Sequence, residues 1–202
     1  MASLLLSFIV SFALLMIAVS VHEFAHGWIA YKLGDNTAKY SGRLTLNPLA
    51  HIDPMWTFFF PLFLYISTGG QFIFGTAKPV PINYWSLNNP KRDISLVGAS
   101  GPAANFILAL LLSLLSKLIP ISILQNLIAI NVVLGVFNLI PIPPLDGSRI
   151  LMGILPPRLT SRYSLIEPYG FIILILLMWM GLLNRIIWPL VEFILKLLGV
   201  IL

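Results

Sequence analysis

The residues best suited to chemistry stand at positions 22–26, which read HEFAH. On an α-helix His22 and His26 are one turn apart and share a face, so their two imidazoles can bind one metal ion. Glu23 then lies beside that ion, where its carboxylate can take a proton from a bound water. This set predicts metal-dependent hydrolysis; the alternative is a polar helix end that binds no metal.

The surroundings of the HEFAH motif favour the metal site. Residues 4–21 carry no charge, and two of the chain's three histidines lie in the motif. Ionisable side chains within an apolar membrane helix are costly and mark functional sites. We therefore expect one zinc ion per chain, bound by His22 and His26, with Glu23 as the general base.

The composition is that of a membrane protein. Of 202 residues, 58% are hydrophobic and only 9% are charged, whereas soluble domains carry about a quarter charged residues. We expect an all-α polytopic membrane protein, a bundle of about 4–6 transmembrane helices in the lipid bilayer. The net charge of +5 does not indicate nucleic acid, because the charges lie between apolar runs, and the absence of cysteine excludes disulfides and thiol chemistry.

Residues 1–202 read as a single domain, with a catalytic core over about 1–150 and C-terminal membrane helices over about 165–202. A homo-oligomer is left open. Helices are expected near residues 3–33, 93–118, 121–140 and 167–183, while 186–202 either returns through the membrane or lies on it.

The segment between the first two long helices is irregular. Residues 37–46 alternate and predict a short β-hairpin or strand pair near the active site. Residues 55–67 are apolar but short and contain Pro61, which favours a re-entrant or broken helix with residues 69–80 as the return. Residues 78–81 read KPVP and must be extended.

Helix polarity gives a topology. The helices 93–118 and 121–140 are joined by a tight turn at Pro120 and are therefore antiparallel. If Asp146 helps the HEFAH motif, the ends of the first and third long helices share a membrane face. Most of the basic residues fall on that face: Lys32, Lys39, Arg43, Lys78, Lys91, Arg92, Arg149, Arg158 and Arg162. The positive-inside rule then predicts a multi-pass cell-membrane protein whose active site faces the cytoplasm.

A catalytic zinc needs a third protein ligand and an open position. The candidates are His51, Asp53 and Asp146, and more weakly Asp35. Asp146 follows a spanning helix in a proline-broken segment, and such backbone is tolerated at membrane depth only where it lines a protein cavity or site. The alternative for Asp146 is a helix N-cap.

Asn105 and Asn138 are polar residues in apolar helices. Together with His51 they are candidates for substrate binding or transition-state support. Hydrogen bonding that only joins helices is the alternative for both asparagines.

Taken together, these motifs resemble those of a known family, the site-2 proteases, which are intramembrane zinc metalloproteases. The similarity lies in HEFAH at 22–26, in GPAAN at 101–105, and in the stretch from Asn138 to Asp146-Gly147. Residues 46–54 resemble a compact bacterial branch of that family. Together these stretches span most of the chain through residue 150.

The resemblance implies that His22, His26 and Asp146 bind zinc, and it favours Asp146 over His51. It implies hydrolysis of a peptide bond in or near a transmembrane segment of a membrane-protein substrate, as in regulated intramembrane proteolysis. Two alternatives remain: a membrane metal-binding or transport protein, and another HExxH membrane endopeptidase. A transporter needs a relay of polar ligands across the membrane, which the C-terminal helices hardly offer.

Overall fold

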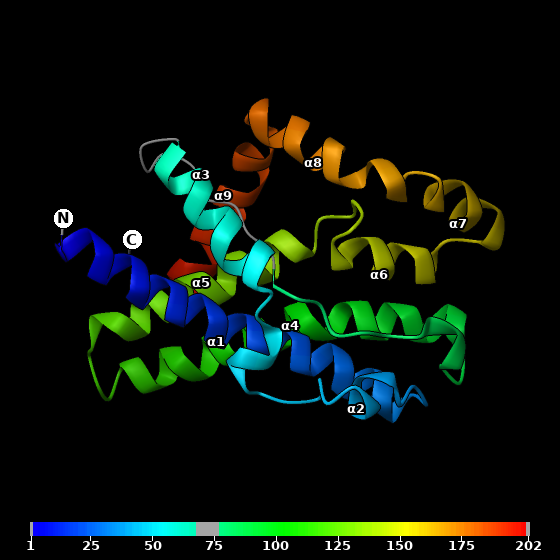
Figure 1. Cartoon of the computed structure of the whole chain (residues 1–202), viewed down its shortest axis with the longest axis horizontal. Helices are drawn as coiled ribbons and strands as arrows, with labels where there is room; N and C mark the ends of the chain where they lie inside the picture. Colours follow the sequence, from blue (N-terminus) through cyan, green and yellow to red (C-terminus); the bar gives the residue numbers. More distant parts are fainter. Residues whose placement is uncertain (1, 68–76, 201–202) are drawn as a thin grey trace.

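The computed structural model describes residues 2–67 and 77–200, and this part of the chain is helical with no strand (Figure 1). The elements are, in order, α1 Ala2–Lys32, α2 Thr37–Tyr40, η1 Pro48–His51, η2 Pro54–Phe59, α3 Phe60–Ser67, η3 Tyr84–Ser86, α4 Pro90–Ser116, α5 Ser122–Asn138, α6 Asp146–Ile154, α7 Pro157–Ser164, η4 Glu167–Tyr169, α8 Gly170–Trp179 and α9 Leu182–Leu197. The expected all-helical class is confirmed.

Among the described residues, 3 helical stretches are long and apolar enough to cross a membrane: Phe8–Lys32, Pro90–Ser116 and Pro157–Trp179. This supports a membrane protein but does not reach the expected number of spans. The reason is helix length, because α5 is apolar but has only 17 residues, and α9 has 16. A straight helix needs about 20 residues to cross the hydrocarbon core.

The centre of the molecule is built by α1, α4 and α5, with α9 packed on the last two. Mostly small and β-branched side chains from α4, α5, α9 and the residues just after α9 form its main apolar cluster: Ala109, Ile128, Val132, Val136, Val191, Leu195 and Val200. Close packing of such residues is how helices associate in lipid, where the hydrophobic effect between helices is weak. α9, Leu182–Leu197, takes up most of the C-terminal stretch that begins at 186.

The end of α1 and the start of α4 lie together. The Asn88 N–H donates to the Leu33 carbonyl over 2.8 Å, so α4 runs back antiparallel to α1. The far end of α6 lies at the same place, since Lys91 Nζ donates to the Met152 carbonyl over 2.6 Å. The helix polarity derived from the sequence agrees with this arrangement.

The hairpin expected over residues 37–46 is wrong, because residues 37–40 form the short helix α2. Local hydrogen bonds explain the difference: Asp35 Oδ1 accepts from both the N–H and the hydroxyl of Thr37. A turn begun by an Asp side chain competes with strand pairing. Residues 54–67 form a π-helical turn followed by α3, and the expected return limb falls outside the described residues except for its end, 77–80.

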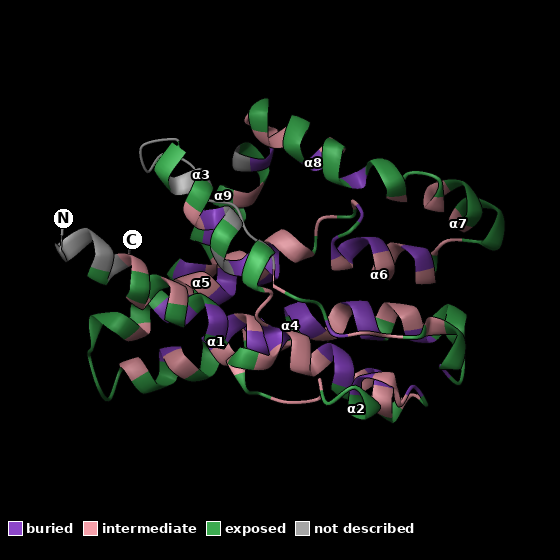
Figure 2. Ribbon diagram, viewed as in Figure 1, coloured by how far each residue is buried: buried purple, intermediate pink, exposed green. Residues whose placement is uncertain are grey.

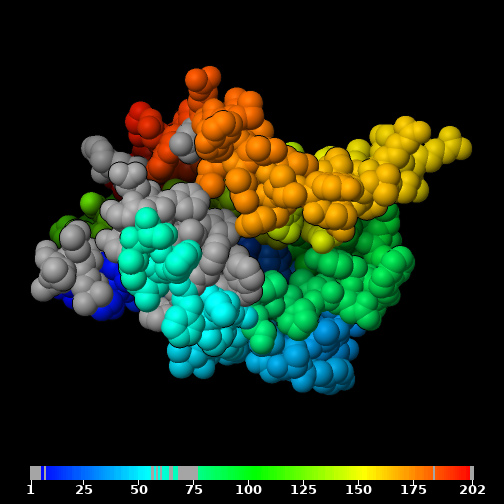
Figure 3. Space-filling model, turned by 45° about the horizontal axis from the view of Figure 1, so that its top comes forward, coloured from blue at the N-terminus to red at the C-terminus, as the bar shows by residue number. Residues whose placement is uncertain are grey.

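The C-terminal part differs from the centre in exposure. Most of α7 and α8 is exposed or half-buried (Figure 2), and in the space-filling view α7 and α8 run along the outside of the molecule (Figure 3). Most of the basic stretch at 148–165 lies in α6 and α7.

Candidate active site

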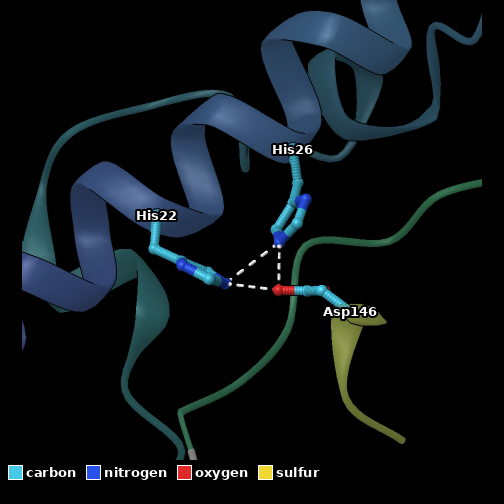
Figure 4. Close-up of side chains that lie close together, drawn as sticks. All are labelled: His22, His26 and Asp146. Atoms are coloured by element: carbon cyan, nitrogen blue, oxygen red, sulfur yellow. Dashed lines mark hydrogen bonds and ion pairs between the residues drawn. The ribbon is translucent and has the colours of Figure 1, made fainter. Parts of the chain in front are cut away.

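Three side chains from two elements converge on one place (Figure 4). His22 and His26 stand on α1, and Asp146 is the first residue of α6. Asp146 Oδ2 lies 3.0 Å from His22 Nε2 and 3.2 Å from His26 Nε2, and the two Nε2 atoms are 3.0 Å apart. Ligand atoms on a tetrahedral zinc with bonds near 2.0–2.1 Å stand about 3.3 Å apart, so the spacing fits.

The other ring nitrogen of each histidine faces an acceptor. His22 Nδ1 lies 2.5 Å from Asn105 Oδ1, and His26 Nδ1 lies 2.7 Å from the Val97 carbonyl. Each Nδ1 must therefore carry the proton and donate it, which leaves a lone pair on Nε2 of the neutral ring. Histidines that bind metals are typically oriented in this way.

The orientation of the Asn105 amide is itself fixed. Its Nδ2 donates to the Ala18 carbonyl over 3.2 Å and to Asn131 Oδ1 over 2.8 Å. The opposite atom, Oδ1, is the one that meets His22. Asn105 and Asn131 are both fully buried, so this network leaves little freedom to the His22 ring.

Two imidazole lone pairs and a carboxylate oxygen thus point at one place. Asp146 Oδ2 is buried and receives no hydrogen bond. Converging acceptors with no donor among them are stabilised by a cation, and the set of two nitrogens and one oxygen suits zinc.

Gly101 of α4 leaves room for that cation. A Cβ at this position would lie 2.3 Å from His26 Nε2 and 2.6 Å from His22 Nε2. Any side chain would fill the space on which the two rings converge. The α4 backbone therefore closes one side of the site without occupying it, which gives a physical reason for glycine at the start of GPAAN.

The turn before α6 aims Asp146. At Gly147 a Cβ would lie 2.2 Å from the Leu139 carbonyl oxygen. Only glycine lets the first turn of α6 approach the end of α5 so closely. Gly147 thus lets the start of α6 pack against the end of α5, and this packing brings the Asp146 carboxylate to the histidines.

Glu23 makes a contact that the sequence did not indicate. Its Oε2 accepts a hydrogen bond from the Val80 N–H over 2.7 Å. Val80 lies in the extended stretch between the described residues 77 and 83, as the KPVP sequence predicts. This backbone runs beside the HEFAH motif and meets it at Glu23.

The other ligand candidates lie elsewhere. His51 is fully buried, and its Nε2 meets the Thr45 carbonyl at 2.9 Å. Asp35 accepts from the Asn83 N–H, and Asp53 Oδ1 accepts from the Met55 N–H. Among the described residues only His22, His26 and Asp146 form a group able to bind a metal.

The two asparagines singled out in the sequence have different surroundings. Asn105 lies on the side of the His22 ring away from Asp146, as its bond to Nδ1 requires. Asn138 Nδ2 donates to the Leu134 carbonyl of its own helix over 2.9 Å. Asn131 was missed, although it is likewise a polar residue in an apolar helix and could have been found by that signal.

Comparison with known proteins decides the family. The sequence model of a protein family described as "Peptidase family M50" matches residues 10–120 and 113–180 of this chain. The chain belongs to this family. It is 36% identical over 192 residues to "Putative zinc metalloprotease YwhC" of Bacillus subtilis, covering 88% of this chain and 84% of that protein. It is also 33% identical over 191 residues to "Putative zinc metalloprotease Rip2" of Mycolicibacterium smegmatis, covering 91% of this chain and 72% of the relative.

A more distant relative is "Zinc metalloprotease MJ0392" of Methanocaldococcus jannaschii, 29% identical over 154 residues, which cover 74% of this chain and 35% of that protein. No solved structure matches the chain. The resemblance drawn from the motifs is confirmed: the M50 chain is a compact bacterial-type member of the site-2 protease family, a zinc metalloendopeptidase associated with a membrane.

Proposed function

We propose that this M50 chain cleaves a peptide bond in or near a transmembrane segment of a membrane-protein substrate. The observation that carries the proposal is the convergence of His22, His26 and Asp146 at the end of the long apolar helix α1, beside Glu23. The three converging side chains would hold zinc, and Glu23 would serve as the general base. Residues up to about 150 would form the catalytic core, with helices over about 165–202 supporting it.

Bound zinc would supply a Lewis acid that acidifies a water and polarises the peptide carbonyl. The Glu23 carboxylate accepts the proton of the attacking water and later delivers it to the leaving amine. Asn105 and Val97 hold the two imidazoles in the tautomer that binds metal. Asn138, near the end of α5, is the candidate for supporting the transition state.

Water and substrate must both reach this site. The space-filling view shows atoms of α1 at the base of a hollow bordered by α4 and α8 (Figure 3). A transmembrane substrate hides its peptide groups in its own helical hydrogen bonds, so we expect a local unwinding before cleavage. The bilayer brings the substrate to the enzyme laterally, and no soluble carrier is needed.

We further propose that the shared end of α1 and α4 faces the cytoplasm in a multi-pass arrangement. The charge distribution supports this, since Lys39 and Arg158 lie at the basic end and Lys117 follows α4 at the other. Cysteines placed at 39 and 158 should react only with a reagent that enters the cytoplasm, and one at 117 with an impermeant reagent. If position 158 is labelled from outside, the protein has the opposite orientation in the membrane.

The test of the function is cleavage of a single-span reporter by purified protein in lipid vesicles, with and without zinc. Cleavage should need the metal and vanish when His22 and His26 are both replaced by Ala, together with the bound zinc. Full zinc content in the double variant would refute the assignment. Transport of zinc into sealed vesicles without any cleavage would favour the transporter alternative.

A further inference from the structure

The short extended segment Lys78-Pro79-Val80-Pro81, termed here the KPVP segment, touches Glu23 and is held by residues outside the catalytic motif. We propose that Arg43 is a positioning residue for catalysis: it holds the KPVP segment so that the Val80 N–H fixes the Glu23 carboxylate. The proposal rests on the proposed role of Glu23 as the base.

The contact with Glu23 is direct. The Val80 N–H donates to Glu23 Oε2 over 2.7 Å, and a hydrogen bond to an ionised carboxylate is stronger than one between neutral groups. A free glutamate side chain rotates about several bonds, so one fixed oxygen restricts the whole carboxylate. The second oxygen, Oε1, can then receive a proton from water at a defined place, and such positioning lowers a reaction barrier.

The two prolines of the KPVP segment restrict its backbone in a way that favours this contact. Pro79 and Pro81 have no N–H, so Val80 supplies the backbone donor between them. Each proline also confines the residue before it to extended backbone, here Lys78 and Val80. The segment therefore presents one N–H in a restricted conformation.

The side chain of Val80 packs the KPVP segment against α1. It is buried, and its Cγ1 lies 3.1 Å from where a Cβ of Gly27 would stand. Gly27 comes one turn after Glu23, so the absence of a side chain there lets the segment lie against the helix face that carries the base.

Two hydrogen bonds hold the other edge of the KPVP segment. The Lys78 N–H donates to the His51 carbonyl over 2.9 Å, and Arg43 Nη2 donates to the Lys78 carbonyl over 2.6 Å. Arg43 Nη2 also lies 3.4 Å from the Pro79 carbonyl. One guanidinium thus reaches the two carbonyls that immediately precede Val80.

Arg43 is in turn fixed by the turn after α2. Its N–H donates to the Ala38 carbonyl over 2.9 Å, and Gly42 before it has a φ of +67°. Glycine adopts this left-handed conformation without strain. The helical turn found in place of the expected hairpin is therefore what directs Arg43 to the KPVP segment.

The first measurement is kinetic. Zinc-loaded Arg43→Gln should lose about ten- to a hundredfold in kcat, as expected when a catalytic group is displaced by about 1 Å, with KM and zinc content unchanged. Arg43→Lys keeps one cationic donor and should recover part of kcat. Arg158→Gln, an exposed arginine at the same end, is the matched control and should behave as the wild type.

The second measurement observes the contact itself. Pro79-Val80 is the single Pro-Val pair in the sequence, so protein with ¹³C-carbonyl proline and ¹⁵N-valine gives one filtered amide signal. This signal should move upfield in Glu23→Ala, where the carboxylate is gone, and in Arg43→Gln. It should stay in place in Arg158→Gln.

The outcomes separate the two proposals. If Glu23→Gln still cleaves, the proposed role of Glu23 fails. If Glu23→Gln is inactive while Arg43→Gln keeps wild-type kcat or leaves the Val80 signal unmoved, only the role of Arg43 fails. Loss of zinc together with activity in both Arg43 variants would also overturn it, since that is a general structural effect.

Discussion

Two carboxylates near α1, those of Asp35 and Asp146, have opposite surroundings. Asp35, just after α1, accepts hydrogen bonds from the Thr37 N–H, the Thr37 hydroxyl and the Asn83 N–H over 3.0, 2.5 and 2.7 Å. Asp146 Oδ2, in contrast, is buried against two imidazole nitrogens and receives no hydrogen bond.

The difference teaches how to distinguish a structural carboxylate from a candidate metal ligand. Each has a buried carboxylate oxygen, although Asp35 as a whole is 1% exposed and the Asp146 side chain is 18% exposed. The neighbours differ. Asp35 is surrounded by hydrogen-bond donors, whereas the neighbours of Asp146 Oδ2 are imidazole nitrogens that act as acceptors. A buried charge without donors is costly unless a cation completes its surroundings.

The largest effect is expected at Glu23, beside the acceptor-rich group. Glu23→Gln keeps the shape of the side chain but cannot take a proton. Reporter cleavage should fall by about 10²–10⁴-fold, while zinc content measured by metal analysis stays at one per chain. Glu192→Gln, an exposed glutamate on α9, serves as the control. Near wild-type cleavage by Glu23→Gln would remove Glu23 from the chemistry.

The comparison is tested most directly by zinc titration of Asp146→Ala. Removing a ligand should lower zinc affinity by at least about tenfold, the loss that even outer partners of metal ligands cause. Asp35→Ala and His51→Ala should bind zinc as the wild type does. His51→Ala should cleave more slowly, because it loses the contact of the ring with the Thr45 carbonyl and so loosens the turn whose His51 carbonyl accepts from the Lys78 N–H. The assignment is reversed if His51→Ala loses zinc and Asp146→Ala retains it.

A smaller effect on zinc affinity is expected at Asn131, which contacts the His22 ring only through Asn105. Asn131→Leu removes the acceptor that holds the Asn105 amide, so the His22 ring is less well oriented. Zinc affinity should fall by about tenfold, at the lower end of losses for outer partners. Gln125→Leu, on an exposed part of the same helix, should not change it. Equal affinities in both variants would show that Asn131 only joins helices.

The smallest effect on zinc, but a clear one on stability, is expected at Asp35. Asp35→Asn turns one acceptor into a donor that faces the Thr37 or Asn83 N–H. The free energy of unfolding should drop by about 1–3 kcal/mol, the cost of a buried polar group left unpaired, measured by thermal unfolding in detergent. Zinc affinity should not change. If Asp35→Asn is as stable as the wild type but binds zinc more weakly, Asp35 is not a purely structural carboxylate and the distinction from Asp146 is wrong.

Much of the site was accessible from local sequence. The spacing of His22, Glu23 and His26 is a property of a single helix, so HEFAH within an apolar run sufficed to predict it. Apolar runs placed α1, α4 and α5 to within a few residues, and the prolines of KPVP predicted extended backbone. In each case the physical cause lies within one turn or a few neighbouring residues.

Long-range relations needed the fold. Asp146 is 120 residues beyond His26, and residue types left it in competition with His51 until the motif resemblance and the packing of α6 on α4 were considered. The hairpin expected at 37–46 gave way to the turn begun by Asp35, since alternation alone cannot show which side-chain hydrogen bonds form. Only the tertiary structure paired Asn105 with His22 and Val80 with Glu23, because these contacts depend on how separate helices and the KPVP segment pack against one another.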